Sequence, residues 1–393
     1  MSGVDATRVA FALSPGSWLG GRNYQRNLFA ALQSLPGTPI HPVLFTGFRD
    51  DGAVQDFPEM EIVRTAVLDR NTPSWLARKI VAKTTSEDIV LRRLLQRNHI
   101  SVVSHSFHLG FHPGRHFALK TIGWIPDFQH LHMPEFFGAE RCRALDRDFR
   151  LICRQCDIVI VSSEIARADM RVFSPENAHK AELLRFIANP AQSIDAPSLE
   201  DLKRLYGFST PYFLLPNQFW MHKNHRVVLS ALRNLKERGK SYVVLATGST
   251  KDFRDPSFFS SLMQYAAQCG VLDSFRVLGQ IPYDHLVGLM RHAVAFMNPS
   301  LFEGWSTSVE EAKSMGKQIV LSDIPVHREQ APERGFYFSA QDPDALTAAM
   351  IAAYDGFDAR TDSEMQDVAL SRFPARQQEF GEIYRRIIER LKA

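Results

Sequence analysis

The sequence predicts an α/β fold with two Rossmann-like domains, and three observations support that class. At 393 residues the chain is too long for one ordinary hydrophobic core. Short apolar runs alternate with longer segments of helical periodicity, which is typical of βαβ units around a mostly parallel sheet. The same rhythm begins again after residue 205, so we expect a second domain built like the first.

The elements can be placed in order along the chain. We expect a first domain over residues 1–190 and a second over residues 205–375, because residues 189–199 are rich in proline and small polar residues and lack periodicity. Apolar side chains at helical spacing predict a last helix over residues 376–393. The apolar runs predict strands at residues 9–13, 43–45, 102–104, 121–125, 158–161, 212–215, 242–246, 275–278, 293–297 and 319–321, and the clearest early helical patterns are residues 25–35 and 141–155.

Composition narrows the classes of function. The 46 basic and 43 acidic residues nearly cancel, which argues against nonspecific binding to nucleic acid. The four cysteines are too few for a disulfide framework, so we expect reduced thiols. The sequence opens without a basic leader, and no apolar run approaches the length of a membrane-spanning helix. These features favour a cytoplasmic protein with small-molecule partners and, at most, peripheral contact with the inner membrane surface.

The chemistry is expected in residues 295–329, where an apolar strand runs into a polar turn and then a helix. A helix start at the carboxyl edge of a sheet presents free backbone N–H groups, which bind phosphates. Glu303 and Glu311 bracket this helix start, and carboxylates accept strong hydrogen bonds from sugar hydroxyls. The residues between them combine a glycine, which permits close backbone approach, with hydroxyl groups that reach phosphate or sugar oxygens: Gly304, Trp305, Ser306, Thr307 and Ser308.

A capping box is the alternative explanation of the same residues. Thr307 with Glu310, or Ser308 with Glu311, has the spacing of a hydroxyl cap and a carboxylate that bonds back to it. With Thr307 as the cap, Glu311 stays available for a ligand. With Ser308 as the cap, Glu311 is structural.

This stretch resembles the E-x7-E motif of the retaining glycosyltransferases of family 4, also called glycosyl transferases group 1. The segments PSLFEGWS and SDIPVHRE are similar to this family's sequences, and the resemblance is strongest over residues 212–329. It implies the GT-B fold, with a cleft between two Rossmann-like domains and a C-terminal helix that crosses back to the first. It also implies that Glu303 faces the donor sugar, that Glu311 faces the ribose, and that Gln280 and Ile281 lie beside the nucleobase.

The resemblance assigns the diphosphate to the start of the next helix. There the block HKNH contains Lys223 and Asn224, and a lysine at this position neutralises the charge of a leaving diphosphate. The family pairs this lysine with an arginine five residues earlier, where the chain has Gln218. Either His222 or another cation substitutes, or Lys223 and the helix start suffice.

Gly20 and Gly21 follow the first predicted strand and precede a helix. A glycine loop at this place admits a donor phosphate or an acceptor against backbone amides, with Arg22 as a cation. The alternative is a purely structural turn. The G-x-G-x-x-G fingerprint of dinucleotide-binding proteins is absent from this segment.

A second polar segment follows the strand predicted at residues 121–125. It contains Asp127 and His130, which the strand's carboxyl end would point into a cleft. Many family members carry a His-Asp pair here, and this chain has Pro126 in place of the histidine. Asp127 is therefore our first catalytic candidate and His130 the second. The alternative is that His130 and His132 only pack the following turn.

His105, His108 and His112 follow another predicted strand, and histidines are common metal ligands. No carboxylate pattern accompanies them, and GT-B enzymes generally work without a metal. We therefore expect neither a metal nor another cofactor.

Residues 69–97 hold seven Lys or Arg and three acidic residues, with Trp75 and Leu76 among them. Such a stretch suits contact with anionic lipid, and the alternative is a solvated helix or loop.

Together these features imply a retaining transferase in cell-surface polysaccharide synthesis. It would move a hexose-like sugar from a nucleoside diphosphate donor to a saccharide or lipid-linked acceptor. No protein nucleophile is assigned, because the family's mechanism is thought to use front-face attack assisted by the donor phosphate. The alternatives are a nucleotide-sugar epimerase or hydrolase, and a non-catalytic nucleotide-sugar-binding protein, which the departures at Pro126 and Gln218 keep open.

Overall fold

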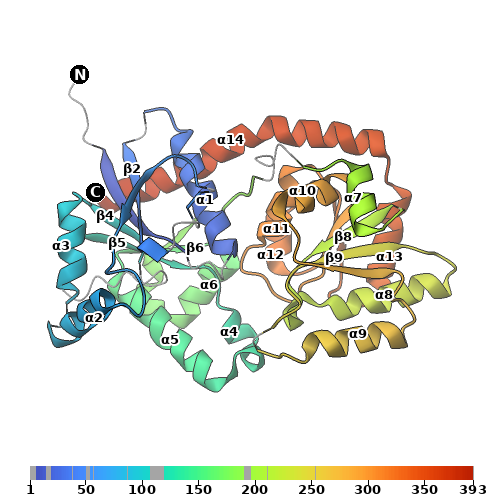
Figure 1. Ribbon diagram of the computed structural model, residues 1–393, viewed down its shortest axis with the longest axis horizontal. Helices are drawn as coiled ribbons and strands as arrows, with labels where there is room; N and C mark the ends of the chain where they lie inside the picture. The colour runs from blue at the N-terminus through green and yellow to red at the C-terminus, as the bar shows by residue number, and fades with distance from the viewer. Residues whose placement is uncertain are drawn as a thin grey trace. The chain divides into compact units, whose positions relative to one another are not determined.

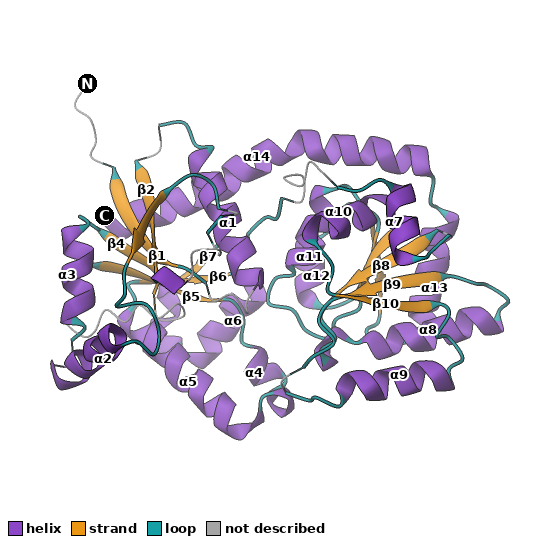
Figure 2. Cartoon of the chain, in the orientation of Figure 1, coloured by secondary structure: helices purple, strands orange, loops and turns teal. Residues whose placement is uncertain are grey.

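The computed structural model describes residues 6–14, 19–37, 39–49, 54–55, 57–85, 87–106, 119–189, 196–209, 211–252 and 254–392. The chain forms two compact units, each built around its own parallel sheet with helices on both faces (Figures 1 and 2). The prediction of two Rossmann-like α/β domains is therefore confirmed. Unit 1 comprises Met1–Pro134, Gly138–Ile187 and Ala375–Ala393, and unit 2 comprises Glu135–Phe137 and Ala188–Pro374.

The described part of unit 1 contains a seven-stranded sheet in the order β3-β2-β1-β4-β5-β6-β7, with every neighbouring pair parallel. Its strands are β1 (Thr7–Ala12), β2 (Ile40–Thr46), β3 (Glu61–Arg64), β4 (Val102–Ser106), β5 (Lys120–Ile125), β6 (Ile158–Val161) and β7 (Ala181–Leu183). Its helices are α1 (Leu19–Gln33), α2 (Pro73–Thr85), α3 (Ile89–Arg97), α4 (Gln129–His132), α5 (Gly138–Gln155) and α6 (Glu164–Phe173), with a 3-10 helix at Pro175–Lys180. Another 3-10 helix, Pro134–Phe136, begins at the last residue of the first segment of unit 1 and continues into residues assigned to unit 2.

The described part of unit 2 contains a six-stranded parallel sheet in the order β10-β9-β8-β11-β12-β13. Its strands are β8 (Tyr212–Pro216), β9 (Val243–Thr247), β10 (Phe275–Gly279), β11 (Ala295–Asn298), β12 (Ile319–Ser322) and β13 (Gly335–Phe338). Its helices are α7 (Leu199–Tyr206), α8 (His225–Glu237), α9 (Phe258–Gln268), α10 (Tyr283–His292), α11 (Thr307–Ser314), α12 (Pro325–Gln330) and α13 (Pro343–Asp355), with a 3-10 helix at Met221–Lys223.

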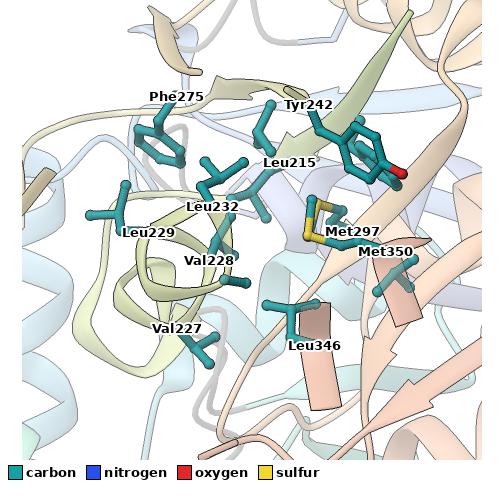
Figure 3. Close-up of a cluster of buried hydrophobic side chains, with 14 of the residues drawn as sticks. Leu215, Val227, Val228, Leu229, Leu232, Tyr242, Phe275, Met297, Leu346 and Met350 are labelled. Carbon is teal, nitrogen blue, oxygen red and sulfur yellow. The ribbon is translucent and has the colours of Figure 1, made fainter. Parts of the chain in front are cut away.

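The sheet of unit 2 is buried on both faces, which explains why its strands are continuous apolar runs. On one face, Val228 and Leu232 of α8 pack with Leu346 and Met350 of α13 against the strands (Figure 3). On the other face, α7, α10 and α11 pack on the alternate strand residues, among them Leu214. The two layers hold the turns that follow β8 and β11 in place.

Unit 1 is covered in the same way. Helices α5 and α6 pack on β5 and β6, and α3 packs on β1, β2 and β4. Phe11, on the opposite face of β1, contacts Phe29 of α1 and Tyr384 of the last helix, α14 (Ala359–Lys392). This helix begins earlier than the predicted residue 376. It belongs to unit 2 up to Pro374 and to unit 1 from Ala375.

Helix boundaries follow ordinary capping chemistry. Asp88 and Ser163 accept hydrogen bonds from first-turn N–H groups of α3 and α6, and Asp342 caps α13. Gly207 ends α7 in the left-handed conformation that glycine adopts without strain. None of the helices in the described part of the chain combines the length and the apolar character that crossing a lipid bilayer requires.

Candidate functional site

The strand order of unit 2 reverses between the neighbouring strands β8 and β11. The helices that follow them, α8 and α11, pack on opposite faces of the sheet. Open α/β sheets bind ligands outside the carboxyl ends of the strands at such a switch point. The turn after β8 carries Lys223 and the turn after β11 carries Glu303, so these two predicted residues come from the turns that meet there.

Lys223 and Glu303 form a largely buried ion pair at this point. Nζ of Lys223 lies 2.6 Å from Oε1 of Glu303, and the two side chains are 13% and 9% exposed. Ser300 Oγ donates to the same carboxylate oxygen at 2.7 Å. The Asn298 side-chain amide donates to the same oxygen at 3.4 Å. Burial is the largest single influence on the pKa of Glu303 and raises it, but the lowering influences together, with the charge of Lys223 foremost among them, bring the pKa to about 2. Glu303 is therefore an ionised carboxylate at neutral pH, held by three donors.

Helix α11 begins at this site with a cap that differs from both predicted capping boxes. Ser306 is the N-cap, and its side chain accepts a hydrogen bond from the Val309 N–H. Thr307 and Ser308 are the first two helical residues, so the predictions that one of them is the cap are wrong. Glu310 accepts hydrogen bonds from side chains of α11 and α12 instead of closing a box. First-turn N–H groups have no partner within their own helix, so this end offers donors to an anion.

Glu311 projects from the next turn of α11. Its side chain is buried, and its Oε1 accepts a hydrogen bond from Tyr283 Oη at 2.9 Å. Tyr283 is the first residue of α10 and follows the loop that contains Gln280 and Ile281. This hydrogen bond brings the β10–α10 loop against α11, so the loop predicted to read the base lies beside the predicted ribose carboxylate.

Three buried histidines lie within electrostatic reach of the Lys223–Glu303 pair. Burial is the largest cause of a lowered pKa at His222, His225 and His327, and it brings the pKa of His225 to about 3. All three imidazoles are therefore neutral at pH 7. A neutral imidazole at His222 does not supply the second positive charge for a diphosphate, so the geometry favours the other two options.

Gln218 and Asn224 shape the turn around Lys223. Gln218 Oε1 accepts a hydrogen bond from the Ser249 N–H at 2.7 Å. The Asn224 amide donates to two backbone carbonyls, at 3.0 and 2.8 Å, and its backbone is left-handed with φ of 56°. Asn224 therefore positions the turn through its own hydrogen bonds. Gly304 and Trp305, both half-buried, complete the turn between Glu303 and the cap of α11.

Arg254 is a cation near this turn. Its guanidinium lies 4.8 Å from the centre of the Trp220 ring, and the His222 ring lies 5.8 Å from the same indole. Asp252 binds the guanidinium through both carboxylate oxygens. The aspartate and the indole hold Arg254 in one orientation beside the residues that precede Lys223.

Unit 1 has a switch point of its own, between β1 and β4. Gly20 and Gly21 follow β1, but they lie in the first turn of α1 and not in the predicted loop. The prediction of a glycine loop is corrected accordingly, because the helix starts at Leu19, one residue before the pair. The Arg22 side chain donates to the Ser14 carbonyl at 3.2 Å. What this segment offers a ligand is the N–H groups of a helix start.

Asp127 and His130 follow β5 and differ in exposure. Asp127 is half-buried, and its Oδ1 accepts a hydrogen bond from the Gln129 N–H at the start of α4. His130 is buried among phenylalanine rings, with its Nε2 3.1 Å from Asp146 Oδ1. His132 pairs with an aspartate of α6. This geometry favours the packing alternative for both histidines and leaves Asp127 as the stronger candidate of unit 1.

His105 belongs to an interior network of hydrogen bonds. Its ring nitrogens lie 2.9 Å from Ser104 Oγ and 2.8 Å from Tyr24 Oη. His108 and His112 lie outside the described residues. Among the residues that the structure does describe, no group of three His, Cys, Asp or Glu side chains could hold a metal ion.

Sequence reasoning missed three contributors to the site. Ser300 could have been found from the sequence, because it is a hydroxyl residue just beyond the end of a predicted strand and three residues before Glu303. His327 was quoted only as part of a resembling segment and received no role. Tyr283 has no local signal, because its partner lies 28 residues further along the chain.

Comparison with known proteins finds a family model that matches part of unit 2. Residues 208–363 match the family model described as glycosyl transferases group 1. That segment contains Lys223, Glu303 and Glu311.

Curated relatives share low sequence identity. The chain is 27% identical to the O-antigen chain mannosyltransferase RfbU of Salmonella typhimurium over 140 residues, which cover 35% of this chain and 37% of that protein. It is 22% identical to O-antigen chain mannosyltransferase B of Escherichia coli over 264 residues, which cover 67% of each protein. The match thus spans little more than a third of the first relative and two thirds of the second.

Solved structures match over nearly the whole chain. The Anabaena protein HepE, in complex with UDP and glucose, aligns with a TM-score of 0.70 at 15% identity, covering 98% of this chain and 99% of that one. Sucrose-phosphate synthase of Thermosynechococcus elongatus aligns with a TM-score of 0.68 at 16% identity and the same coverage. These matches show that the two units have the GT-B fold.

Proposed function

We propose that this protein, whose residues 208–363 match the glycosyl transferases group 1 model, is a retaining glycosyltransferase. It moves a hexose-like sugar from a nucleoside diphosphate donor to a saccharide or lipid-linked acceptor. Cell-surface polysaccharide synthesis is the proposed setting, supported by the two O-antigen mannosyltransferase relatives.

One observation carries the proposal: the buried Lys223–Glu303 pair stands at the switch point of unit 2, beside the N-terminus of α11. A nucleotide sugar needs a cation and N–H donors for its diphosphate and a carboxylate for its sugar hydroxyls. This point of the sheet supplies all of them within two adjacent turns.

The mechanism follows from the charges at the site. Lys223 and the N–H and hydroxyl groups of Thr307 and Ser308 stabilise the negative charge that develops on the leaving diphosphate. Glu303, ionised and fixed by three donors, accepts hydrogen bonds from the sugar and orients it. Glu311 accepts hydrogen bonds from the ribose hydroxyls. Because these groups supply the compensating charge, the proposal includes no metal.

In this proposal Arg254 supplies the positive charge of the family's arginine, because the chain has Gln218 at that arginine's position. His222 is neutral, so it cannot supply the second positive charge. Arg254 is positively charged and oriented by its contacts with Asp252 and the Trp220 ring. In unit 1, Asp127 and the helix start at Gly20 and Gly21 are assigned to the reacting sugar and the acceptor.

Calorimetric titration with UDP, GDP and ADP, without added metal, tests the donor site. We expect one nucleotide to bind selectively, which directs the search for the donor sugar. Binding of none of the three would overturn the donor site and favour a homologue without this activity. Transfer of the sugar only to water would favour the hydrolase alternative.

The change Glu311→Ala tests the ribose carboxylate within the same titration. It is expected to weaken nucleotide binding by about 2 kcal/mol, the order of a lost hydrogen bond to a charged group. Tyr283→Phe is the matched control, because it removes the hydrogen bond to Glu311 and leaves the carboxylate in place. If both variants bound as the wild type does, Glu311 would have a structural role only.

A further inference from the structure

Helix α2 buries a charged side chain and exposes apolar ones, which is the reverse of the pattern of an ordinary surface helix. Its buried side includes a charged residue, Arg78, which is 2% exposed and lies 2.7 Å from Asp88. Asp88 also caps α3 by accepting a hydrogen bond from the Leu91 N–H. Breaking a buried ion pair of this kind is costly, so the pair fixes which face of α2 points inward.

The outward face of α2 carries large apolar side chains. Leu76 is 53% exposed and Ile80 is 59% exposed, although both are aliphatic. They lie four residues apart and so share one side of the helix, with Lys79 and Lys83 at three-residue steps from them. Arg78 lies on the opposite side of the helix, because it follows Leu76 by two residues and two residues make slightly more than half a helical turn. We call these four residues, Leu76, Lys79, Ile80 and Lys83, the outer face of α2.

Charge around the outer face is one-sided. Every acidic residue of the segment is engaged elsewhere: Asp69 accepts from two backbone N–H groups, Glu87 pairs with Arg92, and Asp88 pairs with Arg78. No described acidic side chain pairs with the remaining cations of α2, α3 and the turn before α2, which are Arg70, Lys79, Lys83, Arg93 and Arg97. Helices α2 and α3 and the turn before α2 therefore combine two exposed aliphatic side chains with five positive charges that have no acidic partner among the described residues.

We propose that the outer face of α2 docks on the surface of an anionic lipid bilayer. The aliphatic side chains enter the boundary between headgroups and acyl chains, and the lysines extend their charged ends to the lipid phosphates. A dispersed set of cations with no acidic partner suits a diffuse negative surface better than a protein interface with paired charges. The proposal does not rest on the transferase activity, because it concerns a different unit and a different surface.

Sedimentation of the full-length protein with vesicles tests the proposal. One set of vesicles contains equimolar phosphatidylcholine and phosphatidylglycerol, and the other contains phosphatidylcholine alone. We expect the protein to sediment with the anionic vesicles and to be released by added salt, which screens surface charge. The double variant Leu76→Gln/Ile80→Gln and the double variant Lys79→Gln/Lys83→Gln are each expected to lower the partition by about tenfold or more.

Val172→Gln is the matched control, because Val172 is 84% exposed on α6 of the same unit but lies outside the outer face. It is expected to bind vesicles as the wild type does. Three of the four altered side chains are exposed and Lys79 is half-buried, so an unchanged melting temperature shows that each variant is folded. The proposal is overturned if the wild type ignores anionic vesicles, binds both kinds equally, or retains its binding in either double variant. Binding to nucleic acid in place of vesicles would also overturn it.

Discussion

His225 shows how burial sets the charge of a single residue at the candidate site. It is fully buried, and its ring stacks on Phe219 at 4.4 Å. Among the described residues, neither ring nitrogen finds a hydrogen-bond partner. Burial is the main cause that lowers the pKa of His225 to about 3, so the folded protein holds a neutral imidazole there.

Replacing His225 by phenylalanine is expected to reduce the acid sensitivity of unit 2. The pKa in the folded state is below the unfolded value of about 6.5, so only the unfolded chain takes up the proton. The contribution of neutral His225 to the free energy of unfolding is complete above about pH 6.5 and is lost as the pH falls towards 3. At about pH 5 the loss is roughly 2 kcal/mol. Calorimetric melting at neutral pH and at about pH 5 measures it, and His179→Gln, at an exposed position, is the control. An equal drop in wild type and His225→Phe would contradict this assignment.

The residues of the candidate site could be predicted from the sequence only where they lie within one strand-turn-helix segment. Glu303 and Glu311 share one strand-turn-helix segment, and Lys223 begins the corresponding segment after β8, so spacing and resemblance found them. The neutral state of His222 could not be predicted, because it depends on burial by residues distant in sequence. The cap at Ser306 was missed because three consecutive hydroxyl residues fit the capping pattern equally well.

At the scale of elements, all the central strands and one edge strand, β10, could be predicted, and the other three edge strands could not. Every strand predicted from an apolar run exists, and all of them except β10 are central strands, which are covered on both faces. β3, β7 and β13 were missed, since they are short, lie at sheet edges and are only partly buried. The start of α1 was misplaced because glycine pairs usually mark turns. Here the two glycines lie in the first helical turn.

Within unit 1, α14 approaches α1 at a glycine. A Cβ added at Gly381 would lie 2.8 Å from the Ala31 carbonyl oxygen and 3.2 Å from Leu35 Cδ1. The first of these contacts is with backbone, which has no alternative rotamer. Gly381 therefore sets the distance between the two helices.

The change Gly381→Ala is expected to destabilise unit 1, although alanine favours helix formation by about 1 kcal/mol over glycine. The forced separation of the helices costs about 1–3 kcal/mol, the range found for overpacked cores. Gln378→Ala, at an exposed position of the same helix, is the control and should be neutral or slightly stabilising. Thermal melting of both variants measures the difference, and a higher melting temperature for Gly381→Ala would contradict the close approach.

At the scale of the molecule, α14 contributes to both units. Its early part is fixed in unit 2 by Asp362, which pairs with the buried Lys317 and with Arg334. Its last part supplies buried side chains to unit 1, namely Phe380, Tyr384, Ile387, Ile388 and Leu391. Tyr384 Oη also donates to Ser104 Oγ at 2.8 Å. The folding of unit 1 therefore depends on residues that follow unit 2 in the sequence.

Ending the chain after Pro374 is expected to unfold unit 1 and to leave unit 2 folded. The truncation removes five buried side chains, and each contributes about 1.5–3 kcal/mol when fully buried. Their sum is roughly 10 kcal/mol, which equals the whole stability of a typical domain. Unit 2 keeps all its residues up to Pro374, including the Asp362 ion pairs. Calorimetry should show one melting transition in place of those of the intact chain, and limited proteolysis should spare residues 196–374 while cleaving the first 187. A truncated chain that resisted proteolysis throughout would show that unit 1 has a sufficient core without α14.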